Sequence, residues 1–129
     1  MARIHNNLAA PLLAVSLCTS FGILTPGFAG EVKAYVVQEI QVTDATKYKE
    51  YADQAPATMA AFGGTAIVVR SGAVDVIAGA PPAGGVVVLE FPSMAKAKAW
   101  HESAAYQKVL AIRNASSTSR VYIVEGVMP

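Results

Sequence analysis

Cysteine and histidine are scarce in this sequence of 129 residues, which has one cysteine and two histidines. Cys18 lies in an apolar N-terminal stretch. The chain after this stretch has no thiol, which excludes disulfides, thiolate metal ligands and a cysteine nucleophile there. His101 is the only histidine after the same stretch, and one histidine without a nearby carboxylate pair does not make a metal site. We therefore expect no metal and no other cofactor.

Charged residues are also sparse, and they are balanced in sign. They make up 15% of the sequence, with 10 Lys and Arg against 9 Asp and Glu. Arg3 is the only charged residue before Glu31, so the rest of the chain has a net charge of zero. No run of basic residues remains, and we expect neither nucleic acid nor an anionic membrane surface as a partner.

The N-terminal stretch has the layout of a secretory signal peptide. Arg3 precedes an apolar segment from Leu8 to Leu24, and small residues precede a cleavage point after Ala29. We therefore expect residues 1–29 to be removed and residues 30–129 to form one domain, exported most simply to a bacterial periplasm because it lacks disulfides. An uncleaved segment that anchors the domain in the membrane is the alternative.

Hydrophobic periodicity predicts alternating strands and helices in residues 30–129. Alternation of apolar and polar residues predicts four main strands, and we expect a short returning strand after the second of them. Apolar residues at spacings of three and four predict one long helix that Pro56 kinks or divides, followed later by two helical segments. The expected strands are 32–42, 65–70, 74–78 (short), 86–91 and 120–127, the expected helices are 45–62, 93–103 and 105–115, and the expected linker is 116–119.

This order of elements matches the ferredoxin-like βαββαβ arrangement, an α+β fold in which helices cover one face of a four-stranded antiparallel sheet. The other face needs a cover if it is apolar. The run from Val86 to Leu89 is apolar on both faces of its strand. We therefore expect a homodimer in which a second copy of the chain covers the open face.

Two long segments resemble a known family. The sequence KAYVVQEIQVTDATKYKEYADQAPATMAAFGG, followed by VVVLEFPSMAKAKAWHESAAYQKVLAIRNASSTSRVYIVEG, is similar to domain-of-unknown-function family 1330. The resemblance covers residues 33–126 and implies a ferredoxin-like domain that pairs into a dimeric α/β barrel, in a superfamily that includes cofactor-free oxygenases and isomerases. The family usually has an aromatic residue where His101 stands here, and an arginine where Gly85 stands.

Glu90 is the first candidate for chemistry because it interrupts a strand of β-branched residues. If Leu89 and Phe91 pack on the helices, Glu90 points into the barrel between the two sheets. Strand alternation places further polar side chains on the same face, and such a group in an apolar pocket is a candidate site. These residues are Glu39, Arg70 and Arg120, with Tyr35 and Tyr122 beside them. The alternative is a set of structural ion pairs.

The helices carry the other candidates. His101 is a candidate general base, with a surface or capping role as the alternative. Tyr106 is a candidate for the mouth of a cavity, with core packing as the alternative. Arg113 is expected on the same helical face as Tyr106, where it would hold a ligand carboxylate through two hydrogen bonds or pair with an acid across the dimer.

These residues suggest an exported domain that binds a small molecule in the cavity of a dimeric barrel. The resemblance implies cofactor-free acid–base or oxygenase-type chemistry, for which Glu90 and His101 are the candidate catalytic residues. Glu39, Arg70, Tyr106, Arg113 and Arg120 are the candidate ligand-binding residues. The alternative function is a non-catalytic structural dimer in the periplasm that has no ligand site.

Overall fold

The computed structural model describes residues 30–70 and 74–128. The expected signal peptide, Cys18 and the cleavage point after Ala29 lie outside these residues. Within them, no helix is long and apolar enough to cross a membrane.

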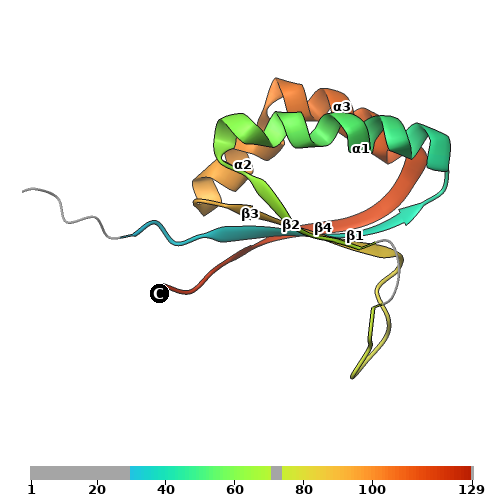
Figure 1. Cartoon of the computed structure of the whole chain (residues 1–129), viewed down its shortest axis with the longest axis horizontal. Coiled ribbons are helices and arrows are strands. Elements are labelled where there is room, and N and C mark those ends of the chain that lie inside the picture. Colours follow the sequence, from blue (N-terminus) through green and yellow to red (C-terminus); the bar gives the residue numbers. More distant parts are fainter. Residues whose placement is uncertain (1–29, 71–73, 129) are drawn as a thin grey trace, which may run out of the picture.

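One antiparallel sheet of four strands forms the base of the domain (Figure 1). The strand order is β2-β3-β1-β4, so β1 and β3 are central and β2 and β4 are the edges. The strands are β1 (Ala34–Val42), β2 (Thr65–Arg70), β3 (Gly85–Phe91) and β4 (Ser117–Glu125). This order, with helices between β1 and β2 and between β3 and β4, confirms the predicted ferredoxin-like α+β fold.

Three α-helices lie together on one side of the sheet (Figure 1). They are α1 (Ala45–Met59), extended by the 3₁₀ turn η1 (Ala60–Phe62), α2 (Met94–Glu102) and α3 (Ala104–Ser116). Each α-helix begins at an N-cap whose side chain accepts a backbone N–H three residues later, namely Asp44, Ser93 and Ser103.

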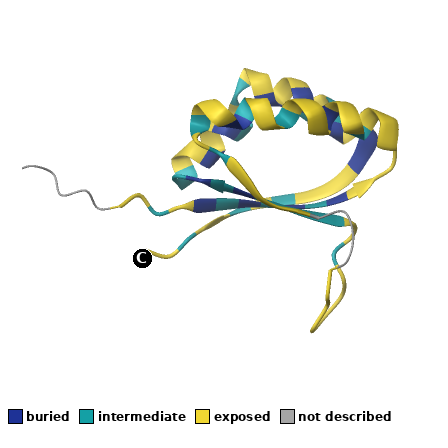
Figure 2. Cartoon of the chain, in the orientation of Figure 1, coloured by how far each residue is buried: buried dark blue, intermediate teal, exposed yellow. Residues whose placement is uncertain are grey.

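The core lies between the helices and the sheet. Alternate residues of β1 are buried against the helices, and so are Leu89 and Phe91 of β3. Figure 2 shows that the buried residues lie in the helices and strands. Trp100 and Tyr106 cover them from α2 and α3, with ring centroids 3.9 Å apart. Because Leu89 and Phe91 face the helices, Glu90 faces the opposite side of the sheet.

Two local predictions are wrong, and one of the two alternatives predicted at Pro56 is excluded. Residues 74–78 form no strand. The edge of β3 with which they could pair is occupied by β2. Residues 74–84 instead extend away from the sheet, on the side opposite the helices (Figure 1). Residues 116–119 form no linker, because α3 ends at Ser116 and β4 begins at Ser117. The backbone of Ser117 pairs with that of Val42, and such pairing does not require an apolar side chain. Pro56 does not divide α1. Proline has no N–H to donate to the carbonyl of Ala52, four residues earlier, and Ala52 is an exposed residue.

Candidate functional site

The face of the sheet away from the helices, which we call the open face, has three rows of residue positions set by the strand register. The central row is apolar, and several apolar residues of this face are exposed to solvent: Val68 by 38%, Tyr122 by 41% and Val124 by 42%. From β2 to β4, the rows are Arg70, Val86, Glu39, Arg120; then Val68, Val88, Val37, Tyr122; then Thr65, Glu90, Tyr35, Val124.

Glu39 and Arg120 form an ion pair in the first of these rows. The carboxylate of Glu39 is largely shielded, whereas the side chain of Arg120 is mostly exposed, and its guanidinium lies 5.6 Å from the ring centroid of Tyr122. Arg70 is the last residue of β2, and its backbone lies in the same row. The structure does not describe its side chain. The register therefore brings three of the four predicted charged positions of the open face into one row.

Glu90 lies at the other end of the open face. It is separated from the row of Glu39 by four residues along β1, or about 13 Å. Its carboxylate accepts a hydrogen bond of 2.7 Å from Nζ of Lys33, and this bond lowers the pKa of Glu90 and raises that of Lys33. The predicted cluster is thus divided into two ion pairs, and Glu90 is ionised at neutral pH.

His101 lies on the other side of the sheet, at the end of α2. Its ring is 5.6 Å from that of Tyr106 and 6.4 Å from that of Trp100, and it borders a hollow of about 190 Å³ beside β4. Because the sheet separates His101 from Glu90, the two candidate catalytic residues do not meet within one chain.

Arg113 and Tyr106, by contrast, lie in direct contact beneath the helices. Nη1 of Arg113 donates to the phenol oxygen of Tyr106 at 2.9 Å and to the amide oxygen of Gln38 at 3.3 Å. The guanidinium also lies 5.9 Å from the ring centroid of Tyr51. The sequence analysis predicted the first two residues but missed Gln38. The signal was available, because Gln38 is the polar member of the buried series Ala34, Val36, Ile40 on β1.

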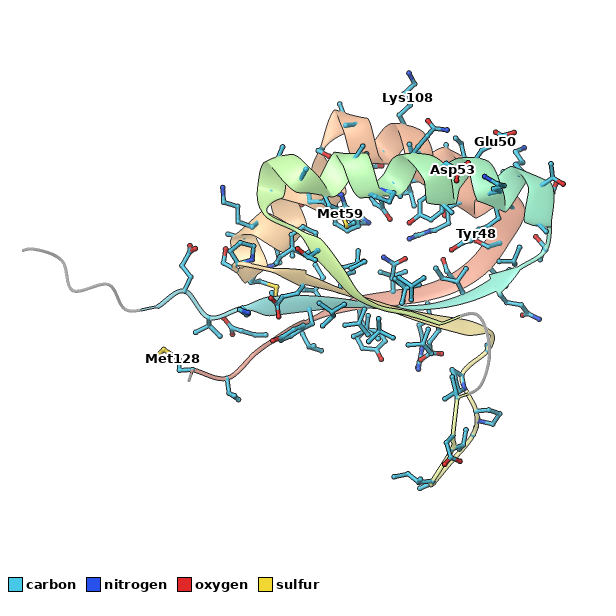
Figure 3. The ribbon with its side chains drawn as sticks, viewed as in Figure 1. Tyr48, Glu50, Asp53, Met59, Lys108 and Met128 are labelled. Carbon is cyan, nitrogen blue, oxygen red and sulfur yellow. The ribbon has the colours of Figure 1, made fainter. Side chains whose placement is uncertain are left out.

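A cavity of about 170 Å³ lies beside this group, between α1 and the sheet. Tyr48 and Met59 extend from α1 toward the sheet at two points along its length (Figure 3). A larger open hollow of about 570 Å³, which shares Tyr48 with the cavity, lies toward the loop that contains Pro81. The cavity is lined by Gln38, Ile40, Tyr48, Tyr51, Ala52, Ala55, Pro56, Met59, Ala66, Val69, Val87, Leu89 and Trp100.

Two of the tyrosines beside the cavity, Tyr48 and Tyr106, have raised pKa values and remain uncharged at neutral pH. Burial raises the pKa of Tyr106 far above its ordinary value, with a further contribution from Tyr51, and burial also raises the pKa of Tyr48. No Asp, Glu, His or Lys is among the lining residues. In the described part of the chain, no group of three or more His, Cys, Asp or Glu side chains could hold a metal ion. The chemistry offered here is hydrogen bonding and one fixed positive charge.

Comparison with solved structures shows the same fold in several bacterial proteins at low sequence identity. The RPA0582 protein of unknown function from Rhodopseudomonas palustris is 17% identical, with a TM-score of 0.62, covering 77% of this chain and 85% of that chain. SnoaB, a cofactor-independent oxygenase from Streptomyces nogalater, is 11% identical with a TM-score of 0.54, covering 76% and 96%. A putative antibiotic biosynthesis monooxygenase from Nitrosomonas europaea is 16% identical with a TM-score of 0.50, covering 79% and 96%.

These neighbours have the fold of the dimeric α/β-barrel proteins. A comparison with curated proteins gives no match. The family described as a domain of unknown function (DUF1330) matches residues 33–127, which confirms the resemblance found in the sequence. With most of its length matched, the chain belongs to the DUF1330 family.

Proposed function

We propose that this domain binds a small organic molecule in the cavity between α1 and the sheet. The observation that supports this proposal is the combination of apolar walls with a few polar groups from Gln38, Tyr48 and Tyr51. Ligand sites typically combine a mostly apolar lining with a few convergent polar groups. A cavity of about 150 Å³ in another protein accepts benzene, so about 170 Å³ suits a single aromatic ring.

Trp100 provides a direct reporter for this proposal, because it is the only tryptophan and it lines the cavity. Benzyl alcohol, a neutral probe with one ring, is expected to change the fluorescence of Trp100 in a saturable way. Replacing Ala55, which lines the cavity, with phenylalanine fills the space and is expected to weaken this binding by about 10-fold or more, as steric exclusion costs at least about 1.4 kcal/mol.

Ala57→Phe is the matched control, because Ala57 lies on the same helix but is exposed and does not line the cavity. This variant should bind the probe as the unmodified protein does. Circular dichroism establishes that both variants are folded. A titration without saturation in the unmodified protein, or equal binding by the Ala55 and Ala57 variants, would contradict the proposal.

The catalytic form of this proposal is cofactor-free acid–base or oxygenase-type chemistry on the bound molecule. The described activity of SnoaB, which shares the fold, supports the oxygenase class. Since the cavity walls offer no Asp, Glu or His, such a reaction would depend on acidity within the ligand itself. The alternative function, a structural dimer without a ligand site, predicts no saturable binding of benzyl alcohol.

We also propose a homodimer in which the open faces of two copies meet. The apolar central row and the exposed valines and tyrosine of the open face support it, because an apolar sheet face requires a cover. Residues 74–84 extend on the same side of the sheet, and Ile77 there is 96% exposed (Figure 1). Such an arm is suited to reach around a second copy.

For localisation, we propose export to a bacterial periplasm with cleavage after Ala29. The basic start, apolar segment and small residues of positions 1–29 support it. Protein released from the periplasm of a bacterial host is expected to have the mass of residues 30–129. Ala29→Arg should prevent cleavage, because the cleavage site requires a small residue. Recovery of the full-length chain in the membrane fraction would instead support the anchored alternative.

A further inference from the structure

Arg113 places a permanent positive charge in the core. Arg113 lies on α3, where this helix packs over the sheet, and the residue is only 5% exposed. A guanidinium cannot lose its proton at any ordinary pH. A buried charge is costly unless it is paired with an opposite charge and fully hydrogen-bonded.

The neighbours of this guanidinium do not supply that pairing. Its two hydrogen bonds go to the neutral oxygens of Tyr106 and Gln38, and both use the same nitrogen, Nη1. Nε is buried without a hydrogen-bond partner. The ion pairs among the described residues join Lys33 to Glu90, Lys49 to Asp53 and Arg120 to Glu39, so none of them includes Arg113.

The phenols around Arg113 do not supply the negative charge either. Burial raises the pKa of Tyr106 and of Tyr48, so both remain protonated and uncharged at neutral pH. Gln38 has no charge in any state. Within the described residues, the positive charge is therefore left without a partner of opposite sign.

The same neighbours connect Arg113 to the cavity. Gln38, which accepts a hydrogen bond from Arg113, and Tyr51, whose ring lies beneath the guanidinium, both line the cavity. Arg113 itself is not among the residues that line the cavity, so Gln38 and Tyr51 mark where an anionic group of a bound molecule would approach its guanidinium.

We propose that the ligand of this domain is a small aromatic carboxylate whose ring fills the cavity under α1 and whose carboxylate pairs with Arg113. This inference rests on the proposed function and adds the charge of the ligand. A planar carboxylate matches the fork of a guanidinium through two parallel hydrogen bonds. A ring of benzene size matches the volume of about 170 Å³.

Benzoate, benzyl alcohol and acetate separate the two parts of the proposal when each is titrated against the fluorescence of Trp100. Benzoate is expected to bind about 10-fold or more tightly than benzyl alcohol, because a hydrogen bond to a charged group adds about 1.5–3 kcal/mol. Arg113→Met should remove this preference for benzoate and change the affinity for benzyl alcohol less than about 3-fold, the change that about 0.6 kcal/mol gives.

Lys108→Met is the matched control, since Lys108 is an exposed cation on the same helix and does not line the cavity. It should leave the benzoate preference unchanged. Arg113→Lys is the second variant, for the case that the methionine variant does not fold. Lysine keeps the positive charge but cannot donate two parallel hydrogen bonds to a carboxylate, so this variant is expected to retain only part of the preference for benzoate.

Each other result overturns a defined part of the proposal. If benzoate and benzyl alcohol bind the unmodified protein equally, or the variants at position 113 keep the preference, Arg113 does not hold the ligand, whereas the proposed function stands. If neither ring compound binds, both proposals fail. If acetate or inorganic phosphate binds as tightly as benzoate and requires Arg113, the aromatic ring has no part in recognition.

Discussion

Trp100→Ala is expected to lower the free energy of unfolding by about 3–5 kcal/mol, out of a total stability that is about 5–15 kcal/mol for such domains. Trp100 is 1% exposed, and its ring packs on Phe91 and Tyr106 at centroid distances of 5.1 Å and 3.9 Å. Its indole N–H donates to the hydroxyl of Thr58 at 2.9 Å. The substitution leaves a void at the point where all three α-helices approach the sheet.

Urea denaturation followed by circular dichroism measures this loss, because the variant has no tryptophan for fluorescence. Trp100→Phe is the matched control. It keeps an aromatic ring in the core but loses the hydrogen bond to Thr58, so it is expected to cost about 1–2 kcal/mol. A loss below about 1 kcal/mol for the alanine variant would mean that Trp100 does not pack as described.

Val88→Asp is expected to convert the proposed homodimer into monomers. Val88 lies in the apolar central row of the open face, between Val68 and Val37. In a symmetric dimer each copy would bring an unpaired carboxylate into the contact, and burying such a group costs several kcal/mol. We therefore expect the dissociation constant to rise about 100-fold or more, since about 2.8 kcal/mol corresponds to that factor.

Sedimentation velocity at micromolar concentration measures this change directly. Ala111→Asp, an exposed position on α3 in the helical layer, introduces the same charge away from the open face and should leave the dimer intact. Unmodified protein that sediments as a monomer would disprove the dimer proposal. It would leave the cavity under α1 untouched, since one chain lines that cavity alone.

Strand and helix periodicity were sufficient to predict the fold. The alternation around Leu89 and Phe91 and the order of elements both correspond to the structure. The sequence failed where backbone pairing rather than side-chain type decided the outcome. Residues 74–78 are mostly apolar but unpaired, and Ser117 is polar but paired with Val42. Backbone hydrogen bonds do not depend on the side chain, so hydrophobic pattern does not report them.

The candidate site was predicted only in part. The sequence identified Tyr106 and Arg113 because they share a helical face, but the hydrogen bond from Arg113 to Gln38 joins residues 75 positions apart. Glu90 was assigned to the correct face of the sheet, whereas its pairing with Lys33 depends on how β1 and β3 lie side by side. The cavity is a property of packing volume, which no local pattern encodes. The roles proposed for Glu39, Glu90, His101 and the three arginines remain predictions.

The position of β1 in the centre of the sheet has a consequence for the order of synthesis. Residues 34–42 leave the ribosome early, yet one of their two partner strands is residues 117–125. The sheet therefore remains incomplete until almost the whole domain has been translated, and pairing between segments so distant along the chain is slow. A nascent polypeptide of this topology stays unfolded for longer, with the unpaired edges of its valine-rich strands exposed during that time.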